Sequence, residues 1–282
     1  CHYSFPLSSP QMKAKKSFGQ HFLVQEPVAE RLASSLVTTG CDGIVEVGPG
    51  KGILTKYLAR QSLPVYAVEL DRDLIPFLEK EFSGTSVKIV SGDILRVRLD
   101  EILGPDAHFV IAGNFPYNIS SQIVFLGIQH RHHVPFMAGM FQREMAERIC
   151  SGPGSKEFGV ISVLTQAYFH TAMLFYVKPG SFNPPPKVNS AVISLTRYRT
   201  DIEGVPFNLL RQVVKMAFSQ RRKKLRNTLK TLIPEAFLRD ANLADLRPEQ
   251  LSVDQFIMIA RNVTQQASSE MNLPDPQSDD LS

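Results

Sequence analysis

The sequence has little of what marks disulfide-rich, metal-binding or membrane-spanning proteins. Its three cysteines, Cys1, Cys41 and Cys150, are odd in number and far apart, and they lack metal-ligand spacing. No apolar run approaches transmembrane length, and no signal-peptide pattern is visible. The cluster His130–His133 has no carboxylate or cysteine at ligand spacing, so we interpret it as a polar helix end. These absences predict a cytoplasmic protein without a metal or a membrane anchor, and we expect a monomer.

Length and charge distribution predict one large domain and one smaller domain. The chain has 282 residues, of which 43% are hydrophobic, enough for a packed core. Its net charge is +4, but residues 266–282 carry four acids and no Lys or Arg, so the remainder is more basic. We expect this acidic end to be disordered. Residues 1–11 show no periodicity and precede Met12, so we expect them to be an extension before a natural start at Met12.

Short apolar segments alternate with helical patterns over the first 200 residues. Such alternation is typical of a doubly wound parallel sheet. The expected strands cover residues 44–47, 65–69, 87–90, 109–112, 136–141, 173–177 and 191–195. The expected helices cover 28–37, 53–59, 74–82, 119–129, 144–149 and 159–170, and beyond residue 205 the pattern is purely helical. The sequence therefore predicts an α/β domain over residues 12–200 and an all-helical domain over residues 205–265.

A glycine-rich segment, Glu46–Gly52, joins the first of these strands to a helical pattern. Glycines at such a turn let the backbone approach a ligand closely and present helix N-terminal amides. The dinucleotide fingerprint G-x-G-x-x-G has its third glycine one position later than this chain has. The order acidic-x-G-x-G-x-G instead resembles the first motif of S-adenosylmethionine-dependent methyltransferases. An ordinary glycine-rich turn is the alternative for this segment alone.

Two carboxylates follow the next two strands. Glu69 lies about 20 residues after the glycine-rich loop, where an acidic residue can accept from a ribose diol. Asp93 follows the third strand and could accept from a cofactor's adenine amine. Each could also be a surface acid at a strand end. Their order is the stronger signal, because ligands in open α/β sheets bind at the carboxyl ends of strands.

The segment Ala112–Tyr117 predicts chemistry on an adenine amine. Transfer of a methyl group to this nitrogen requires its delocalised lone pair to become available. The Asn114 side-chain oxygen and the Phe115 backbone carbonyl could each accept one amine N–H as charge develops. The Tyr117 ring could stack on an unpaired purine. A plain strand-to-loop turn is the alternative.

Two basic stretches bear on partners. Residues 13–23 are basic and then aromatic, as in a solvated arm or an RNA-contacting one. Residues 219–230 are expected to be helical, with Leu225, Leu229 and Leu232 on one face. Six cations without an acid favour binding to nucleic-acid phosphates over a membrane surface. The cations expected to contact RNA are Arg221, Arg222, Lys223, Lys224 and Arg226.

Together these motifs resemble the bacterial small-subunit ribosomal RNA adenine dimethyltransferase A family. Similar proteins include eukaryotic nucleolar dimethyladenosine transferases, mitochondrial transcription factor B proteins and erythromycin-resistance rRNA methylases. The resemblance extends from Lys15 to about Ile259. It is carried, in order, by KKSFGQHFL, EVGPGKGILT, AVELDRDL, GNFPYNIS, FQREMAERI, GSKEFGVISVLTQ, FNPPPKVNSAVISL, AFSQRRKKLRNTL and QLSVDQF.

The resemblance implies a Rossmann-like class I methyltransferase sheet, S-adenosylmethionine as cofactor and particular site residues. Cofactor contacts map onto His21, Leu23, Gly48, Glu69, Asp93 and Asn114. The target-base pocket maps onto Asn114, Phe115, Tyr117 and Phe182. His21 replaces the family's commoner Asn. Phe115 replaces the more usual Leu, and the larger Phe ring is expected to alter the packing of the pocket.

The resulting prediction is dimethylation of two adjacent adenosines in a hairpin near the 3′ end of small-subunit rRNA, with a role in small-subunit biogenesis. The expected partner is this rRNA within an immature small subunit. One alternative is a large-subunit rRNA methylase of the resistance type, against which the triple-proline segment and the QRRKKLRNTL run argue. The other is a non-catalytic RNA- or DNA-binding factor, against which intact Gly48, Glu69, Asp93 and Asn114 argue.

Overall fold

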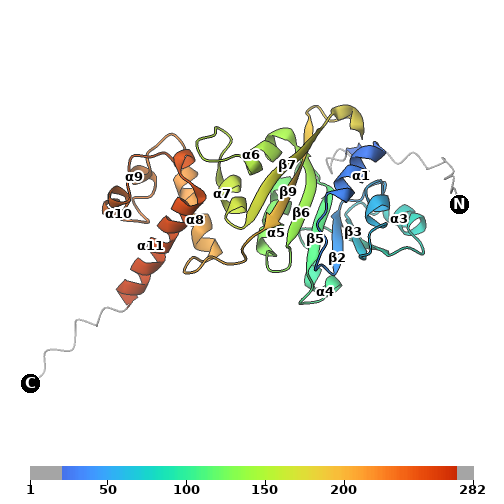
Figure 1. Ribbon diagram of the computed structural model, residues 1–282, viewed down its shortest axis with the longest axis horizontal. Helices are drawn as coiled ribbons and strands as arrows, with labels where there is room; N and C mark the ends of the chain where they lie inside the picture. Colours follow the sequence, from blue (N-terminus) through green and yellow to red (C-terminus); the bar gives the residue numbers. More distant parts are fainter. Residues whose placement is uncertain (1–20, 272–282) are drawn as a thin grey trace, which may run out of the picture. The chain divides into compact units, whose positions relative to one another are not determined.

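The computed structural model describes residues 21–271, and within this range the chain forms two compact units. The first combines residues 21–146 with 172–197, and the second combines residues 147–171 with 198–271. The expected extension at residues 1–11 lies outside the described residues, as does most of the expected acidic tail. Figure 1 shows the strands of the first unit and the helices α8–α11 of the second.

The first unit contains a seven-stranded sheet with the order β4-β3-β2-β5-β6-β9-β7. Pairing is parallel from β4 to β6, and β9 is antiparallel to β6. The sheet strands are β2 (Gly43–Val47), β3 (Val65–Glu69), β4 (Val87–Ser91), β5 (Phe109–Asn114), β6 (Phe136–Gln142), β7 (Phe169–Val177) and β9 (Ser190–Arg197). The predicted α/β sheet is confirmed, and its parallel strands bring their carboxyl ends to one edge.

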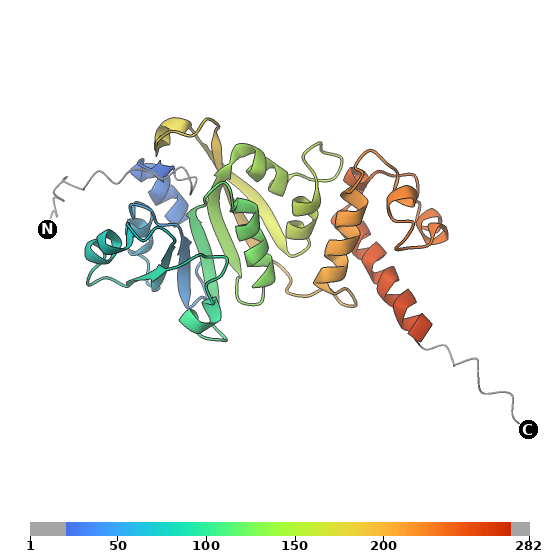
Figure 2. The same ribbon diagram turned by 180° about the vertical axis from the view of Figure 1, so that it is seen from behind.

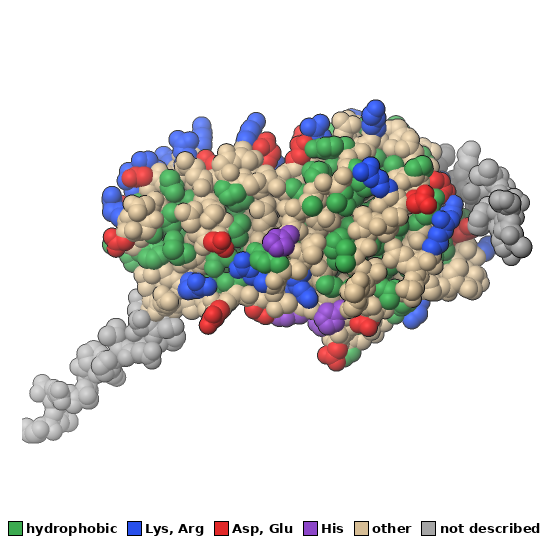
Figure 3. Space-filling view, viewed as in Figure 1, with side chains coloured by type: hydrophobic (Ala, Val, Ile, Leu, Met, Phe, Trp, Pro, Cys, Tyr) green, Lys and Arg blue, Asp and Glu red, His purple; other side chains and the backbone are tan. Residues whose placement is uncertain are grey.

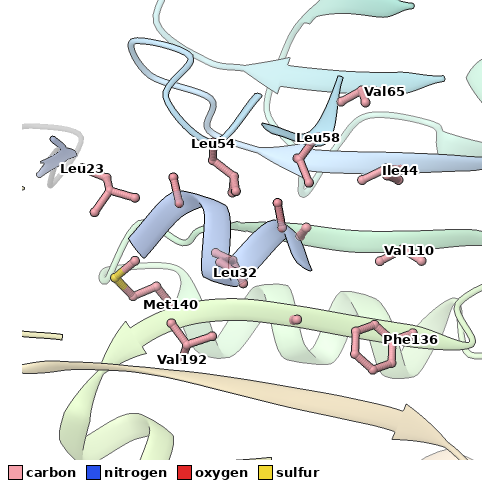
Figure 4. Packing of buried hydrophobic residues seen from close by; sticks show 14 of the residues in the cluster. Leu23, Leu32, Ile44, Leu54, Leu58, Val65, Val110, Phe136, Met140 and Val192 are labelled. Atoms are coloured by element: carbon pink, nitrogen blue, oxygen red, sulfur yellow. The ribbon is translucent and has the colours of Figure 1, made fainter. Parts of the chain in front are cut away.

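Helices cover both faces of the sheet. Helix α1 packs through Leu32 onto the face that carries Ile44, Val110 and Phe136, as Figure 4 shows. Helix α5 packs on the opposite face, where a Cβ at Gly127 would lie 2.1 Å from the sulfur of Met137; Figure 2 shows this helix from behind. The helices of this unit are α1 (Glu26–Ser34), α2 (Thr55–Leu58), α3 (Ile75–Glu81), α4 (Leu99–Leu103) and α5 (Ser120–Gln129).

A two-stranded sheet lies beside the carboxyl edge of the main sheet. It pairs β1 (Phe22–Leu23) with β8 (Phe182–Asn183), so that Leu23 lies opposite Phe182. The short η2 helix (Pro179–Ser181) precedes β8. Neither strand was predicted, because two residues are too few to show a period. This pairing places Phe22 and Leu23, at the end of the basic N-terminal stretch, next to the predicted site.

The second unit is built from helices. They are α7 (Val160–Gln166), α8 (Phe207–Phe218), α9 (Leu225–Thr228), α10 (Glu235–Asp240), η3 (Pro248–Gln250) and α11 (Val253–Met271); α6 (Arg143–Cys150) begins in the first unit. Residues 147–171, which the sequence assigns to the α/β domain, belong to this unit. Phe158 packs edge-on against Phe218, and Tyr168 packs edge-on against Phe207.

Three local predictions in the second unit are wrong. The helix expected over residues 159–170 ends at Gln166, and β7 begins at Phe169. Residues 219–224 are not helical, since α8 ends at Phe218 and α9 begins at Leu225. In addition, α11 continues to Met271, so the disorder expected from residue 266 does not hold for residues 266–271. Leu225 and Leu229 are fully buried as expected, whereas Leu232 is only half-buried and Ile233 takes its place in the core.

Candidate active site

A cavity of about 170 Å³ lies at the carboxyl ends of β2, β3 and β5. The fold brings together there eight of the nine predicted cofactor and base-pocket residues: His21, Leu23, Gly48, Glu69, Asp93, Asn114, Phe115 and Tyr117. Phe182 is not among the residues that line the cavity. It is buried and lies opposite Leu23 in the β1–β8 pairing. The predicted cations of residues 221–226 belong to the second unit.

The glycine-rich loop after β2 takes a backbone course that requires glycine. Gly48, Gly50 and Gly52 have φ values of +65°, +59° and +77°, which L side chains rarely adopt. A Cβ at Gly50 would also lie 2.9 Å from the Phe22 ring. The loop therefore follows the floor of the cavity closely, with the arm residue Phe22 packed on it.

Glu69 ends β3 as a buried carboxylate held by backbone amides. Its Oε2 accepts from the Gly50 N–H at 3.0 Å, and its Oε1 accepts from the Asp71 N–H at 2.9 Å. Burial raises the pKa of Glu69 above its usual value, and these two hydrogen bonds oppose the shift. A carboxylate oxygen can accept more than one hydrogen bond, so both oxygens keep capacity for a ligand diol.

Asp93 follows β4 and lies at the same edge. Its Oδ1 accepts from the Leu95 N–H at 3.0 Å, and its Oδ2 lies 3.7 Å from Nε of Arg96. The carboxylate thereby caps the turn that it begins, and it also lines the cavity. The position suits a ligand amine, as the sequence predicts.

Glu46 also lines the cavity, although the sequence indicates it only as the first residue of the glycine-rich motif. It is 1% exposed, and its Oε2 has no hydrogen-bond partner among the described residues. Burial, together with the charge of Glu69, raises the pKa of Glu46 to about 8. An acid directly before a glycine-rich loop was the available signal. Its position inside a strand, one residue before Val47, concealed that it faces a cavity.

Asn114 is oriented by the N-terminal arm. Its Nδ2 donates to the backbone carbonyl of His21 at 2.9 Å. Because a carbonyl oxygen only accepts, the amide nitrogen must be the atom that faces His21. The other end of the amide, Oδ1, is thereby directed away from the arm and is available as an acceptor. This is the atom that the proposed chemistry requires.

Tyr117 is held by a buried serine at the start of β9. The Tyr117 hydroxyl and Ser190 Oγ are 2.6 Å apart, and Ser190 is fully buried. Burial raises the pKa of the Tyr117 phenol, so the ring is neutral at physiological pH. The His21 ring lies beside it, with the two ring centroids 5.6 Å apart. Tyr117 thus presents a fixed, uncharged ring at the cavity.

Phe115 places its ring in the core. The side chain is 1% exposed and contacts Phe141 edge-on at 5.1 Å between ring centroids. Space for the ring comes from Gly139 on β6, where a Cβ would lie 2.1 Å from the Phe115 ring. The expectation that the larger ring alters packing holds for the core beneath the site. Phe115 can offer its carbonyl to the cavity while its ring points away.

His21 joins the arm to the proline-rich segment. Its Nδ1 donates to the carbonyl of Pro184 at 2.8 Å, since that oxygen can only accept. The Val24 N–H donates to the Ser181 carbonyl at 2.8 Å. The arm is therefore attached on one side to residues 181–184 and on the other to Asn114.

The cavity fits a cationic nucleoside better than a dinucleotide. Three acidic residues line it, Glu46, Glu69 and Asp93, and Lys51 is its one lysine. A pyrophosphate would meet the carboxylates of Glu69 and Asp93 unfavourably, whereas a sulfonium or ammonium group would be attracted to them. Glu69 suits a ribose diol, and the partnerless Oε2 of Glu46 suits a donor. These features match S-adenosylmethionine, which supplies an activated methyl group when bound.

The basic run forms a loop whose cations differ in their surroundings. Arg221 donates to the Ser155 carbonyl at 3.2 Å and lies 3.9 Å from Glu249. Lys224 and Arg226 both pair with Asp245, at 2.9 and 2.6 Å. Arg222 and Lys223 are exposed and form no ion pair with any described residue. Lys and Arg side chains are prominent on the rim of this unit in Figure 3.

Residues 21–271 lack the features of a metal site and of a membrane-spanning helix. No group of three or more His, Cys, Asp or Glu residues there could hold a metal ion. No described helix is long and apolar enough to cross a bilayer. Cys41 and Cys150 are free thiols, and burial raises the pKa of each.

Comparison with solved structures defines the class of the fold. The dimethyladenosine transferase from Plasmodium falciparum superimposes with a TM-score of 0.78 at 22% identity, covering 88% of this chain and 98% of that one. The 23S rRNA methyltransferase ErmE superimposes with a TM-score of 0.65 at 26% identity, covering 86% of this chain and 99% of that one. The fold is that of a class I S-adenosylmethionine-dependent methyltransferase with a helical C-terminal part.

Sequence comparison narrows the class to a family. The profile of the ribosomal RNA adenine dimethylase family matches residues 11–265. The ribosomal RNA small subunit methyltransferase A of Flavobacterium johnsoniae is 44% identical over 253 residues, covering 90% of this chain and 97% of that protein. Its counterpart in Porphyromonas gingivalis is 43% identical, with 88% and 97% coverage. The chain belongs to the ribosomal RNA adenine dimethylase family and is an S-adenosylmethionine-dependent methyltransferase.

Proposed function

We propose that this enzyme dimethylates the exocyclic amines of two adjacent adenosines in a hairpin near the 3′ end of small-subunit rRNA. The observation that carries the proposal is the single cavity in which Glu69 and Asp93 lie with Asn114 and Tyr117. A cofactor site and an adenine site that meet in one cavity are what direct methyl transfer requires. The enzyme acts in the cytoplasm, as a monomer, on rRNA within an immature small subunit.

The proposed chemistry assigns alignment and charge stabilisation to the protein. Asn114 Oδ1 and the Phe115 carbonyl accept the two amine N–H groups, and Tyr117 stacks on the base. Bound S-adenosylmethionine would supply the methyl group to the adenine nitrogen, with the sulfur keeping the bonding electron pair, and the amine proton would pass to solvent. Because the sulfonium makes donation favourable, no general base is needed, and the gain comes from orientation and electrostatics.

The second methylation places a different demand on the same residues. A monomethylated amine has one N–H left, so only one of the two acceptors can then be used. The pocket must also accommodate the first methyl group. The Phe115 ring, which lies in the core rather than in the pocket, leaves this space open.

Two alternatives remain in view. ErmE, whose printed name gives 23S rRNA as its substrate, shares the fold at 26% identity. Relatives at 41–44% identity, from Flavobacterium, Porphyromonas, Bacteroides and Phocaeicola, carry the small-subunit name, which favours the small subunit for this chain. A binding-only role is disfavoured because Gly48, Glu69, Asp93 and Asn114 are intact, although a second role in subunit assembly is compatible with catalysis.

We infer that Arg222 and Lys223 make the largest contribution of the basic run to RNA phosphate binding. Arg221, Lys224 and Arg226 already hold carboxylates within the unit, so part of their charge is offset. Free, exposed cations release counterions when they neutralise phosphates, which makes affinity depend on salt. The five cations proposed from the sequence thus divide into two uncommitted and three partnered ones.

The test of function supplies labelled S-adenosylmethionine with immature small subunits or with naked large-subunit RNA and maps the modified bases. We expect dimethyladenosine at two adjacent positions in the small-subunit RNA. Label in large-subunit RNA alone would favour the resistance-type activity, and no label in either RNA would favour the binding-only role.

The test of the RNA surface compares two double variants of equal charge change. Arg222→Gln with Lys223→Gln should weaken binding to small subunits and lower the slope of log affinity against log salt by roughly 1–2, since each lost phosphate contact lowers it by nearly one. Arg72→Gln with Lys80→Gln, which changes exposed cations beside and on α3, is the control. An equal effect of both double variants would show that Arg222 and Lys223 act only through the net charge of the protein, without contacting RNA phosphates.

A further inference from the structure

Lys51 is the only Lys or Arg among the described residues that lines the cavity. It is half-buried, and its Nζ lies over the ring of Phe22, 5.3 Å from the ring centroid. Phe22 also lines the cavity and packs on the glycine-rich loop at Gly50. No carboxylate of residues 21–271 forms an ion pair with Lys51. The contact with Phe22 therefore places an unpaired positive charge at the wall of the cavity.

The backbone amides of the glycine-rich loop are largely committed within the protein. The N–H groups of Gly48 and Gly52 donate to backbone carbonyls, each at 2.9 Å. The Gly50 N–H donates at 3.0 Å to the carboxylate that ends β3, and Pro49 has no N–H. Within this loop, the donors left for an anionic ligand are therefore those of Lys51, its own amide and its ammonium group.

The order of the strands places the amino-acid end of the cofactor at this loop. The carboxyl ends of β4, β3, β2 and β5 lie side by side, with Asp93 after β4, Glu69 at the end of β3 and Asn114 at the end of β5. With the adenine at Asp93 and the ribose at Glu69, the sulfonium lies toward Asn114, past the loop that follows β2. The amino-acid end is bonded to the same sulfur, so it reaches the part of the cavity that this loop and Phe22 line.

We propose that the Lys51 ammonium binds the α-carboxylate of S-adenosylmethionine and makes the enzyme selective for a cofactor that carries this group. The inference goes beyond the proposed function, because it concerns the cofactor and holds whichever RNA is methylated. Without Lys51, the carboxylate would enter a cavity in which Glu69 and Asp93 repel it. An ammonium on a flexible stem, held over an aromatic ring, supplies the opposite charge where the loop amides do not.

The test measures the binding of two ligands by calorimetry in the absence of RNA. The ligands are S-adenosylmethionine and its decarboxylated form, which keeps the adenosine, the sulfonium and the amine but lacks the carboxylate. Lys51→Met, which keeps an apolar stem without the charge, should bind S-adenosylmethionine roughly 5- to 30-fold more weakly. This factor corresponds to about 1–2 kcal/mol for a charge-assisted contact at a half-buried site, 1.4 kcal/mol being tenfold. The variant should bind the decarboxylated form at least as tightly as wild type does.

Three further variants serve as controls. Lys51→Arg keeps the charge and should keep the wild-type preference for the carboxylated ligand. Lys51→Gln repeats the removal of charge with a polar side chain, and it replaces Lys51→Met if that variant does not fold. Lys80→Met, which removes an exposed cation from α3, should bind both ligands as wild type does. Melting temperatures near that of wild type show that the variants are folded.

The outcomes separate this inference from the proposed function. The inference fails if Lys51→Met loses the same factor for both ligands, because the lysine would then act through loop packing or general charge. It also fails if the variant binds S-adenosylmethionine as wild type does, and weaker binding to small-subunit RNA in that case would assign Lys51 to an RNA phosphate. If wild type methylates no small-subunit adenosine, the proposed function fails and the calorimetric result for Lys51 still stands.

Discussion

The ring of Phe115 occupies the space that a side chain at Gly139 would fill. A Cβ built on Gly139 would lie 2.1, 2.5 and 2.7 Å from three atoms of the ring. Gly139 lies on β6, where it is paired with Gly113 of the neighbouring parallel strand β5, and Phe115 directly follows the end of β5. Because Gly139 has no side chain, the ring of Phe115 fits into the core next to β6. An aromatic residue can therefore directly follow Asn114 without placing its ring in the pocket.

This relationship predicts a specific rescue. Gly139→Ala should destabilise the protein by roughly 1–3 kcal/mol, because an added methyl in a close-packed core forces neighbours to shift. Combining it with Phe115→Leu, which removes ring atoms, should recover part of that loss. Urea unfolding of the two single variants and the double variant measures the coupling. Additive free energies would show that the two positions do not share this space.

Asn114→Ala should lower turnover far more than RNA affinity. Its acceptor matters most as charge develops on the adenine amine, so a loss of about 100-fold in the single-turnover rate is expected. Asn114→Asp is an informative companion, because it keeps an acceptor but cannot donate to the His21 carbonyl. Wild-type single-turnover rates in Asn114→Ala would disprove the proposed role.

Glu69→Gln should weaken cofactor binding by roughly 1.5–3 kcal/mol, through loss of charge-assisted hydrogen bonds to the ribose. The variant also leaves one of the two backbone donors, at Gly50 or Asp71, without an acceptor, so the melting temperature should fall as well. Calorimetry with S-adenosylmethionine measures the first effect. Glu79→Gln, an exposed acid on α3, is the charge-matched control. Tight binding of NAD and none of S-adenosylmethionine would contradict the assignment of the cavity.

Glu46→Gln should raise stability in a pH-dependent way. The pKa of Glu46 is about 8 in the folded protein and near 4.5 when unfolded. The folded state therefore holds a proton that the unfolded state has released, and wild-type stability falls as pH rises from about 4.5 to 8. The neutral amide escapes this penalty, which integrates to about 5 kcal/mol. The difference in melting temperature should be small at pH 4.5 and largest at pH 8 and above; a constant difference would mean that Glu46 is ionised throughout.

The position of the site residues at one edge of the sheet could be predicted from sequence, because each of these residues lies at the end of a predicted strand. Glu69, Asp93 and Asn114 each come at or just after the end of an apolar run, and parallel pairing brings such ends together. The class of fold follows from the same alternation and is confirmed by the comparisons. The roles of the individual side chains stay predictions until they are tested.

Features that depend on distant contacts could not be predicted. His21 and Pro184 are 163 residues apart, and no periodic pattern joins them. Helical propensity predicts one helix through residues 219–230, but the N–H groups of Leu225 and Arg226 donate to the carbonyls of Leu246 and Ala244. These tertiary hydrogen bonds compete with continuation of α8. The burial of Glu46 against a cavity is equally invisible, because an acid inside a short strand gives no sign of what its side chain faces.

The carbonyl that orients Asn114 belongs to the backbone of residue 21, and not to its side chain. Every amino acid provides this backbone acceptor. The orientation of the Asn114 amide therefore depends on the path of the backbone at residue 21, and this hydrogen bond does not constrain which side chain residue 21 carries. A histidine at this position is then compatible with the orientation of Asn114. The same logic predicts that displacing the arm would harm catalysis more than any substitution at position 21, even in an enzyme that keeps every catalytic side chain.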